Sequence, residues 1–271
     1  MRASTEAGGT TIAAHFALFI FAWGTNYPLM KLALRDMSPL SFSAARLLGG
    51  AVVIAVIAWM SGERSLQPAT GDRLRLALSG ILQYGCLLAF AAFGLQLLPA
   101  GRTVVAVYSM PLWAALIGLA IGRDMLTLRQ WAGIGMGAVG VSLVLNPNVL
   151  GHGGGAGALL VLAGAVSWAL GAVVHRYRPM TTPLLTQAFY QLVASGAVLT
   201  VIAVAFEADA TVRVTPSLTL VMVWNWLVPT SLAVWSWSRA LRHMPASPAG
   251  QVLMMTPLVG IAAGAVMFDE A

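Results

Sequence analysis

The chain has 271 residues, of which 59% are hydrophobic and only 9% are charged. Soluble domains carry about 25% charged residues, so this composition excludes an ordinary soluble protein. The net charge of +6 does not indicate a nucleic-acid partner, because the 15 basic residues stand singly or in pairs between apolar runs and form no basic patch. The composition predicts a membrane protein whose main partner is the lipid bilayer.

Apolar runs of about 18 residues or more recur along the chain, and each is long enough to cross about 30 Å of hydrocarbon as a helix. They do not alternate polar with apolar residues, which excludes the strands of a membrane β-barrel. The first ten residues are expected to form a short polar tail. The runs predict nine membrane helices, at residues 12–33, 40–61, 74–97, 102–122, 127–146, 157–176, 184–206, 217–239 and 247–268.

The layout of the chain repeats after about 146 residues. Residues 108–124 have a proline near their start and an acid at their end, and residues 254–270 have the same layout, so that Pro111 corresponds to Pro257. Similar offsets relate Trp23 to Trp168, Pro99 to Pro245, and residues 38–40 to residues 182–184. Self-similarity at a fixed spacing indicates two copies of one structural unit.

The repeat predicts a first five-helix unit at residues 1–150 and a second unit at residues 157–271. Residues 151–156 are Gly-rich, with no Lys-Ser/Thr pair after them, and are expected to be a flexible linker and not a phosphate loop. Because each unit has an odd number of crossings, the second enters the membrane from the opposite side, and the repeats are inverted. The second unit has only four predicted helices, so we expect that a tenth helix is missing, either naturally or through truncation.

The basic residues favour a cytoplasmic N-terminus. When alternate loops are counted, ten basic residues fall on the N-terminal side and four on the other. Cytoplasmic loops carry an excess of Lys and Arg, so the distribution agrees with the helix count. We expect a multi-pass protein of the bacterial inner membrane, and a monomer.

Four prolines lie inside or near the ends of apolar runs: Pro28, Pro111, Pro229 and Pro257. A proline frees a backbone carbonyl, which in lipid needs a partner or a water-lined cavity. We therefore expect these prolines to point inward and to act as gating or hinge positions, with a simple kink as the alternative for each. Inverted repeats with interrupted helices are a recurrent arrangement in secondary transporters.

Short motifs along nearly the whole chain resemble those of one membrane-protein family. In the first half they are residues 23–26, Pro39, Arg46, and residues 99–101, 109–111, 122–124 and 131–140. In the second half they recur as residues 168–171, Pro245, and residues 256–257 and 269–270. On these motifs the chain resembles the EamA type of the drug/metabolite transporter superfamily.

This resemblance implies an all-α polytopic fold of ten helices in two inverted five-helix repeats, around a cavity lined by helices one, three, four, six, eight and nine. It also implies export of small metabolites by alternating access. The chain departs from the family pattern in two ways: Arg123-Asp124 replaces a Gly-Glu pair, and the expected tenth helix is absent. Tyr84 and Tyr108 are similar in position to aromatic residues of the YddG-type aromatic amino-acid exporters.

A cavity that accepts amino acids or drug-like cations needs aromatic faces and a few hydrogen-bonding groups. The residues of these types within the predicted spans are expected to bind substrate: Trp23, Asn26, Tyr84, Tyr108, Trp168, Tyr190, Gln191 and Trp235. The alternative for each aromatic residue is an anchor at the membrane interface. We expect aromatic or neutral amino acids as substrates, with drug-like cations left open.

Arg46 is the lone basic residue expected inside a span. Burying a charge in the membrane is costly, so Arg46 should face protein or water. We expect a structural role near the outer boundary, with Asp36 as a partner; contact with a substrate carboxylate is the alternative. Because no carboxylate or histidine is evident in mid-membrane, we favour facilitated export over proton antiport.

Other classes of function find less support. An intramembrane enzyme would need a His and an acid at helical spacing, and the four histidines lack such neighbours. A channel would need rings of charge or filter carbonyls. The single cysteine, Cys86, excludes a disulfide framework and a thiolate metal site. We expect neither a cofactor nor a metal.

Overall fold

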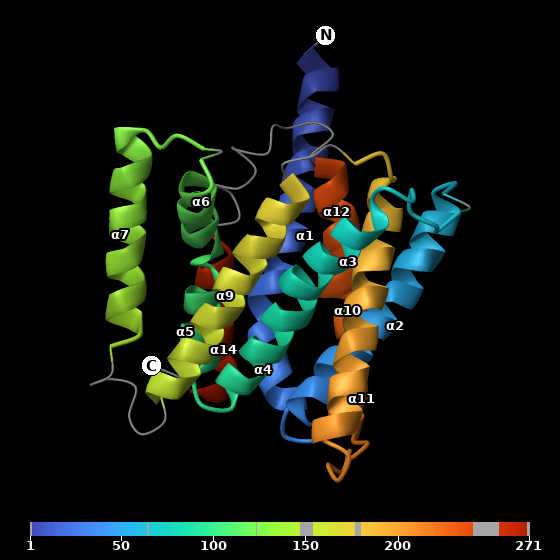
Figure 1. Cartoon of the computed structure of the whole chain (residues 1–271), viewed down its shortest axis with the longest axis vertical. Coiled ribbons are helices and arrows are strands. Elements are labelled where there is room, and N and C mark those ends of the chain that lie inside the picture. Colours follow the sequence, from blue (N-terminus) through green and yellow to red (C-terminus); the bar gives the residue numbers. More distant parts are fainter. Residues whose placement is uncertain are drawn as a thin grey trace.

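The computed structural model describes residues 2–63, 65–122, 124–146, 154–176, 180–240 and 255–269, and within these residues every regular element is a helix. Figure 1 shows most of the helices running along one common direction. The first half holds α1 (Arg2–Ala33), α2 (Pro39–Met60), α3 (Arg73–Gly80), η1 (Ile81–Cys86), α4 (Leu87–Leu95), α5 (Ala100–Val107), α6 (Met110–Ala120) and α7 (Leu128–Val144). The second half holds α9 (Gly154–Arg176), α10 (Leu184–Phe206), α11 (Pro216–Leu227), η2 (Val228–Leu232), α12 (Ala233–Ala240) and α14 (Thr256–Phe268).

The predicted spans are confirmed as helices, with three differences. The expected polar tail is wrong, because α1 begins at Arg2; no proline interrupts these residues, and adding turns to an existing helix is easier than starting one. Helix α9 begins at Gly154, inside the expected linker, while residues 151–153 lie outside the described residues. Of the last predicted helix, residues 247–254 also lie outside them.

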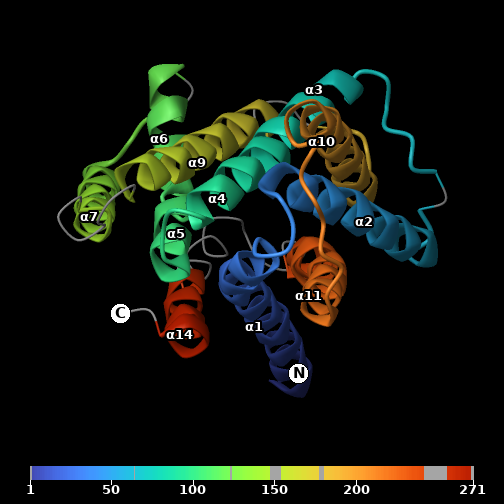
Figure 2. The same ribbon diagram turned by 90° about the horizontal axis from the view of Figure 1, so that it is seen from below.

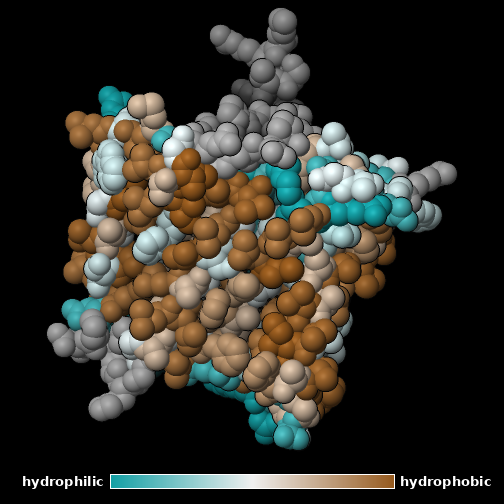
Figure 3. All heavy atoms as spheres, in the orientation of Figure 1, coloured by the Kyte–Doolittle hydropathy of each residue, from teal (hydrophilic) through white to brown (hydrophobic). Residues whose placement is uncertain are grey.

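Length and composition make this a multi-pass membrane protein. Among the described residues, six helical stretches of 21 to 23 residues are long and apolar enough to cross a membrane, and Thr256–Phe268 is a shorter apolar helix. Figure 3 shows apolar side chains across the middle of the visible face and polar side chains gathered toward its ends. Such a surface suits a hydrocarbon layer bounded by water on both sides.

Three spans are interrupted, at positions that follow the sequence repeat. The wide π-helical turns η1 and η2 begin at Ile81 and Val228 and occupy matching places in the third and eighth spans. The fourth span breaks at Tyr108 and Ser109, just before Pro111, and α14 begins at Thr256, just before Pro257. A π-helical turn accommodates a missing N–H, which accounts for Pro229 inside η2.

Helices α2 and α10 form an antiparallel pair that runs through the bundle, and we call it the spine. At each end of the spine, a carboxylate that follows one helix accepts hydrogen bonds from the start of the other helix. The Glu207 carboxylate, after the end of α10, accepts from the side chain of Ser38 and the backbone of Leu40, at 2.6 and 2.9 Å, at the start of α2. The Glu63 carboxylate, after the end of α2, accepts from the Thr186 N–H and hydroxyl, at 3.2 and 3.0 Å, at the start of α10.

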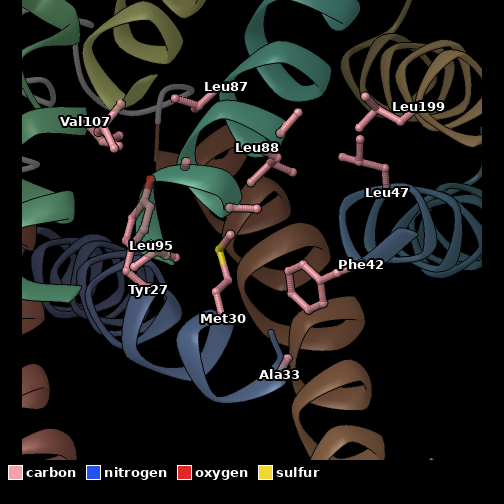
Figure 4. Close-up of a cluster of buried hydrophobic side chains, with 14 of the residues drawn as sticks. Tyr27, Met30, Ala33, Phe42, Leu47, Leu87, Leu88, Leu95, Val107 and Leu199 are labelled. Carbon is pink, nitrogen blue, oxygen red and sulfur yellow. The ribbon is translucent and has the colours of Figure 1, made fainter. Parts of the chain in front are cut away.

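The other helices pack around the spine in two matching groups. Helix α1 packs on α14, α11 and α12, and Figure 2 shows it between α11 and α14. Helix α9 packs on α3, η1 and α4, and on α5 and α6. Helix α7 stands at the edge of the bundle and contacts α5 and α6. The buried core draws on α1, α2, α4, α5 and α10, and Figure 4 shows part of it.

Candidate functional site

One face of α1 carries polar and aromatic side chains near the middle of the bundle. Trp23, Asn26, Tyr27 and Met30 follow the i, i+3, i+4, i+7 spacing that places side chains on one helix face. Trp23 is half-buried, and the other three are fully buried. Figure 4 shows Tyr27 and Met30 projecting from α1 in the same direction, toward α4. This face is therefore turned into the protein.

Arg46 of α2 lies against this face and is 1% exposed. Its Nε donates to Thr230 Oγ1 at 3.2 Å, and its Nη1 donates to Met30 Sδ at 3.1 Å. The guanidinium carbon lies 6.0 Å from the centroid of the Trp23 ring. Neither hydrogen-bond acceptor is charged, and a thioether sulfur is a weak acceptor. Arg46 is thus a buried cation without a carboxylate partner among the described residues.

The expected pairing of Arg46 with Asp36 is wrong. Asp36 lies in the loop before α2, where its Oδ1 is 3.4 Å from Arg213 Nη2 and its Oδ2 accepts from the Thr215 hydroxyl at 2.8 Å. Asp36 joins the loop before α2 to the loop before α11, while Arg46 lies two turns inside α2. Hydration favours an acid at the end of a span over one inside it.

Several buried polar atoms in this region have no hydrogen-bond partner within the described part of the chain. They are Trp23 Nε1, Asn26 Oδ1, the Tyr27 hydroxyl and Thr256 Oγ1. The Asn26 amide nitrogen is satisfied only by Met30 Sδ, at 3.3 Å. An unsatisfied buried polar group costs about 1–3 kcal/mol, so folded proteins keep few of them. Their concentration here makes this region the candidate for a polar binding site.

Tyr108 completes the region from the other side. It sits at the break between α5 and α6, next to Tyr27 and near the hydroxyl of Thr256 at the start of α14. Helix α11 also packs on α1, and the Oδ1 of its Asn225 is buried without a hydrogen-bond partner among the described residues. We call Trp23, Asn26, Tyr27, Met30, Arg46, Tyr108, Thr230 and Thr256 the central polar cluster.

The remaining predicted binding residues make other contacts among the described residues. Trp168 on α9 and Tyr84 in η1 are half-buried and pack against the hydrophobic core. Tyr190 and Gln191 are on α10, where the Gln191 amide donates to Ser79 Oγ at 2.9 Å across the contact with α3. Trp235 on α12 packs edge-on against His15, with ring centroids 5.5 Å apart. Of the predicted set, the structure therefore brings together Trp23, Asn26 and Tyr108.

Three of the four prolines are buried or partly buried. Pro28 and Pro229 are buried, and Pro257 is partly buried at the start of α14. Pro111 is exposed on the first turn of α6, and its inward direction stays a prediction. A proline on a first turn removes an N–H that would have no partner in the helix anyway. At the break before it, the Ser109 hydroxyl donates to the Ala106 carbonyl at 2.6 Å.

Sequence reasoning missed Tyr27, Met30, Thr230 and Thr256. The first two could have been found, because they continue the helical spacing that starts at Trp23. The two threonines join the cluster only through the packing of η2 and α14. Within the described residues, no three His, Cys, Asp or Glu side chains gather closely enough to hold a metal ion.

Several known proteins are similar in sequence to this chain over most of its length. An uncharacterized transporter of Bacillus subtilis (strain 168), YoaV, is 24% identical over 92% of this chain and 85% of its own length. The uncharacterized inner membrane transporter YedA of Escherichia coli (strain K12) is 26% identical over 95% of this chain and 82% of its own. A probable amino-acid metabolite efflux pump of Salmonella typhimurium is 23% identical over 93% of this chain and 85% of its own.

A solved crystal structure has the same fold, with a TM-score of 0.71 over 97% of this chain and 90% of that chain, at 19% identity. The EamA-like transporter family matches residues 11–146 and again residues 155–271. The family and the names of the relatives indicate a small-molecule transporter and not an enzyme. With both matches together spanning nearly all of its length, the chain belongs to the EamA-like transporter family.

Proposed function

We propose that this protein exports amino acids, aromatic or neutral, from the cytoplasm by alternating access between two inverted five-helix units, residues 1–150 and 157–271. The observation that carries the proposal is the central polar cluster. It is drawn from α1, α2 and the α5–α6 break of the first unit and from η2 and α14 of the second. A site shared by two units can open to either side when the units rock against each other.

The matched interruptions support the inverted arrangement. The π-helical turns recur after 147 residues, and α6 and α14 begin 146 residues apart, each just before a proline, Pro111 or Pro257. The packing is also exchanged between units: α1 packs on the eighth and ninth spans, whereas α9, its counterpart, packs on the third and fourth. Each unit thus places its first helix on the other unit, as two copies related by a two-fold axis would do.

The character of the cluster supports amino acids. It combines aromatic faces, Trp23 and Tyr108, with a small number of buried hydrogen-bonding atoms, which is the usual make-up of a small-molecule site. Two relatives carry the name of probable amino-acid metabolite efflux pumps. The efflux named for these two relatives supports an outward direction, and the basic residues favour an N-terminus in the cytoplasm of a bacterial cell.

Facilitated transport is supported by where the acids lie. Asp36, Glu63, Asp72, Asp124 and Glu207 hydrogen-bond or ion-pair at the ends of helices. The charge in the cluster is that of Arg46, and a guanidinium does not release its proton under physiological conditions. A proton antiporter normally uses a titratable side chain in mid-membrane.

Counterflow into proteoliposomes tests the proposal. The purified full chain is reconstituted, and uptake is measured for an aromatic amino acid, a small neutral amino acid and a quaternary ammonium cation. We expect saturable exchange of the amino acids without a pH gradient, reduced by Tyr108→Ala. Gly133→Ala serves as the matched control, because a Cβ at this position of α7 meets no atom within 4 Å. Exchange that strictly requires a pH gradient would replace facilitated export by proton antiport, and no exchange of any amino acid would refute the proposed substrates.

A further inference from the structure

We propose that Arg46 binds the carboxylate of the transported substrate and that the central polar cluster selects zwitterionic α-amino acids over organic cations. This inference rests on the proposed function, because it places the substrate in the same site. It goes further by assigning one charged residue the choice between two substrate classes.

The bonding of Arg46 supports this role. A guanidinium has five N–H donors in a planar fork. In its contacts with the described residues Arg46 uses two of them, one to the Thr230 hydroxyl and one to the Met30 sulfur. An arginine that only held helices together would be expected to meet carbonyl or carboxylate oxygens. The remaining donors match the two oxygens of a carboxylate, which arginine binds in a bidentate way. A carboxylate would also neutralise a cation that is otherwise costly inside a membrane.

The neighbouring unpartnered atoms have the polarity that an amino acid requires. The indole N–H of Trp23 and the hydroxyl of Tyr27 can donate to a carboxylate beside Arg46. Asn26 Oδ1 is an acceptor and can receive a hydrogen bond from an α-ammonium group. The Asn26 amide nitrogen and Arg46 Nη1 both donate to the sulfur of Met30, at 3.3 and 3.1 Å, so the Asn26 amide and the cation lie close to the same atom. A substrate with both charges satisfies the set, whereas a cation alone is repelled by Arg46.

The sequence repeat supplies an independent argument. The offset of 144 that relates Pro39 to Pro183 places Tyr190 at the position of Arg46. The offset of 145 that relates Trp23 to Trp168 places Gly171 at the position of Asn26. A Cβ at Gly171 would lie 2.6 Å from Gln83 Cγ, so α9 is closely packed there. The shared fold is therefore built without these polar groups in the second unit, and their presence in the first needs a reason other than packing.

The test compares substrates that differ in one charged group. Wild-type protein and Arg46→Met, a neutral side chain of similar length, are reconstituted and assayed with phenylalanine and with phenethylamine, which lacks the carboxylate. We expect wild type to move phenylalanine at least 100-fold faster than phenethylamine. Arg46→Met should lose most phenylalanine transport and narrow or reverse this ratio, and Arg46→Lys should be intermediate. Arg213→Met, an arginine with a 70% exposed side chain on an outer loop, is the matched control.

The outcomes separate this inference from the proposed function. If wild type carries both compounds equally, or if Arg46→Met lowers both by the same factor, the carboxylate role is refuted while transport stands. If wild type carries neither of these compounds nor a small neutral amino acid, the proposed function itself fails. Should Arg46→Met not fold, the wild-type ratio and Arg46→Lys decide the question alone.

Discussion

At the ends of the spine the polar groups are hydrogen-bonded, whereas in the central polar cluster several buried polar atoms are not. At one end, the Glu207 carboxylate accepts from Ser38, from the backbone of Leu40, and from the N–H and hydroxyl of Ser41 at 2.9 Å each. In the cluster, several buried polar atoms have no partner in the described part of the chain. The hydrogen bonds at the end of the spine hold two helices in one position. Under the proposed function, the substrate supplies the hydrogen bonds that the cluster lacks.

The proposed function assigns stability to one region and transport to the other. Satisfied bonds and close helix contacts along the spine contribute to the free energy of unfolding, because breaking them leaves groups unpaired. The unpartnered atoms of the cluster do not add to this free energy, and the proposal assigns them to substrate binding. Substitutions in the two regions should therefore separate loss of stability from loss of transport.

The largest loss of stability is expected at Gly80, where α3 meets α10. A Cβ there would lie 2.7 Å from both Cα and the backbone oxygen of Gln191, and a backbone cannot turn aside as a side chain can. Gly80→Ala should destabilise the protein by about 3 kcal/mol, the upper end of overpacking costs. Thermal unfolding in detergent measures this. Gly133→Ala on α7 is the control, and equal midpoints for the two variants would contradict the close contact.

A smaller loss is expected at the end of the spine. Glu207→Ala removes the acceptor of the N–H groups of Leu40 and Ser41 on the first turn of α2. Loss of a helix cap costs about 0.5–2 kcal/mol, and we expect about 2 because two hydroxyl bonds are lost as well. Glu207→Gln keeps an acceptor and should lose less. The same unfolding measurement applies, and the two variants should rank in that order.

The pH dependence of stability follows from the same carboxylates. Partial burial raises the pKa of Glu207, but the hydrogen bonds from Ser38, Leu40 and Ser41 outweigh it, so the net pKa lies below its ordinary value of 4.5. The pKa of Asp72 is lowered chiefly by the Thr182 hydroxyl. A lowered folded-state pKa gives stability that is complete above the unfolded pKa and is lost as pH falls through the folded one.

We therefore expect the unfolding midpoint to be level near neutral pH and to fall below about pH 4.5. Glu207→Gln should show a shallower fall, since one of the titrating groups is gone. Midpoints recorded from pH 3 to pH 7 for both proteins check this. A wild-type curve that rises as the pH is lowered would contradict the assignment.

The smallest effect on stability is expected in the cluster. Tyr27→Phe removes a buried hydroxyl that has no partner in the described residues, so the unfolding midpoint should be unchanged or slightly higher. Counterflow of phenylalanine should fall several-fold, because a donor to the substrate is lost. A clear fall in the midpoint would mean that the hydroxyl has a structural role, and the contrast between the two regions would be lost.

Much of the fold could be predicted from the sequence. The predicted span at residues 184–206 coincides with α10, and the one at residues 40–61 differs from α2 by one residue at each end. Membrane spans can be predicted because an apolar run must be about as long as the membrane is thick, and polar residues mark its two ends. Pro111 and Pro257, at matching repeat positions in the sequence, lie at the starts of α6 and α14.

The site was only partly predictable. Trp23 and Asn26 stand out as aromatic or polar residues within a span, but the approach of Arg46 to Trp23 and Met30 depends on how α2 lies in the bundle. The exposure of Pro111 follows from its place on the first turn of α6, which accepts proline. Nearness between helices depends on their packing angles, which a hydropathy pattern does not contain.

By itself the sequence determined that the chain is a helical membrane protein with an internal repeat, because the length and spacing of apolar runs are set by the membrane. Only the tertiary structure decided that Arg46 faces Met30 and Thr230 and not Asp36. A long guanidinium side chain on α2 can reach any of several neighbouring helices. Which one it meets depends on the packing of α2 against η2 and on Met30 of α1 lying within its reach, a property of the packed bundle and not of any one segment.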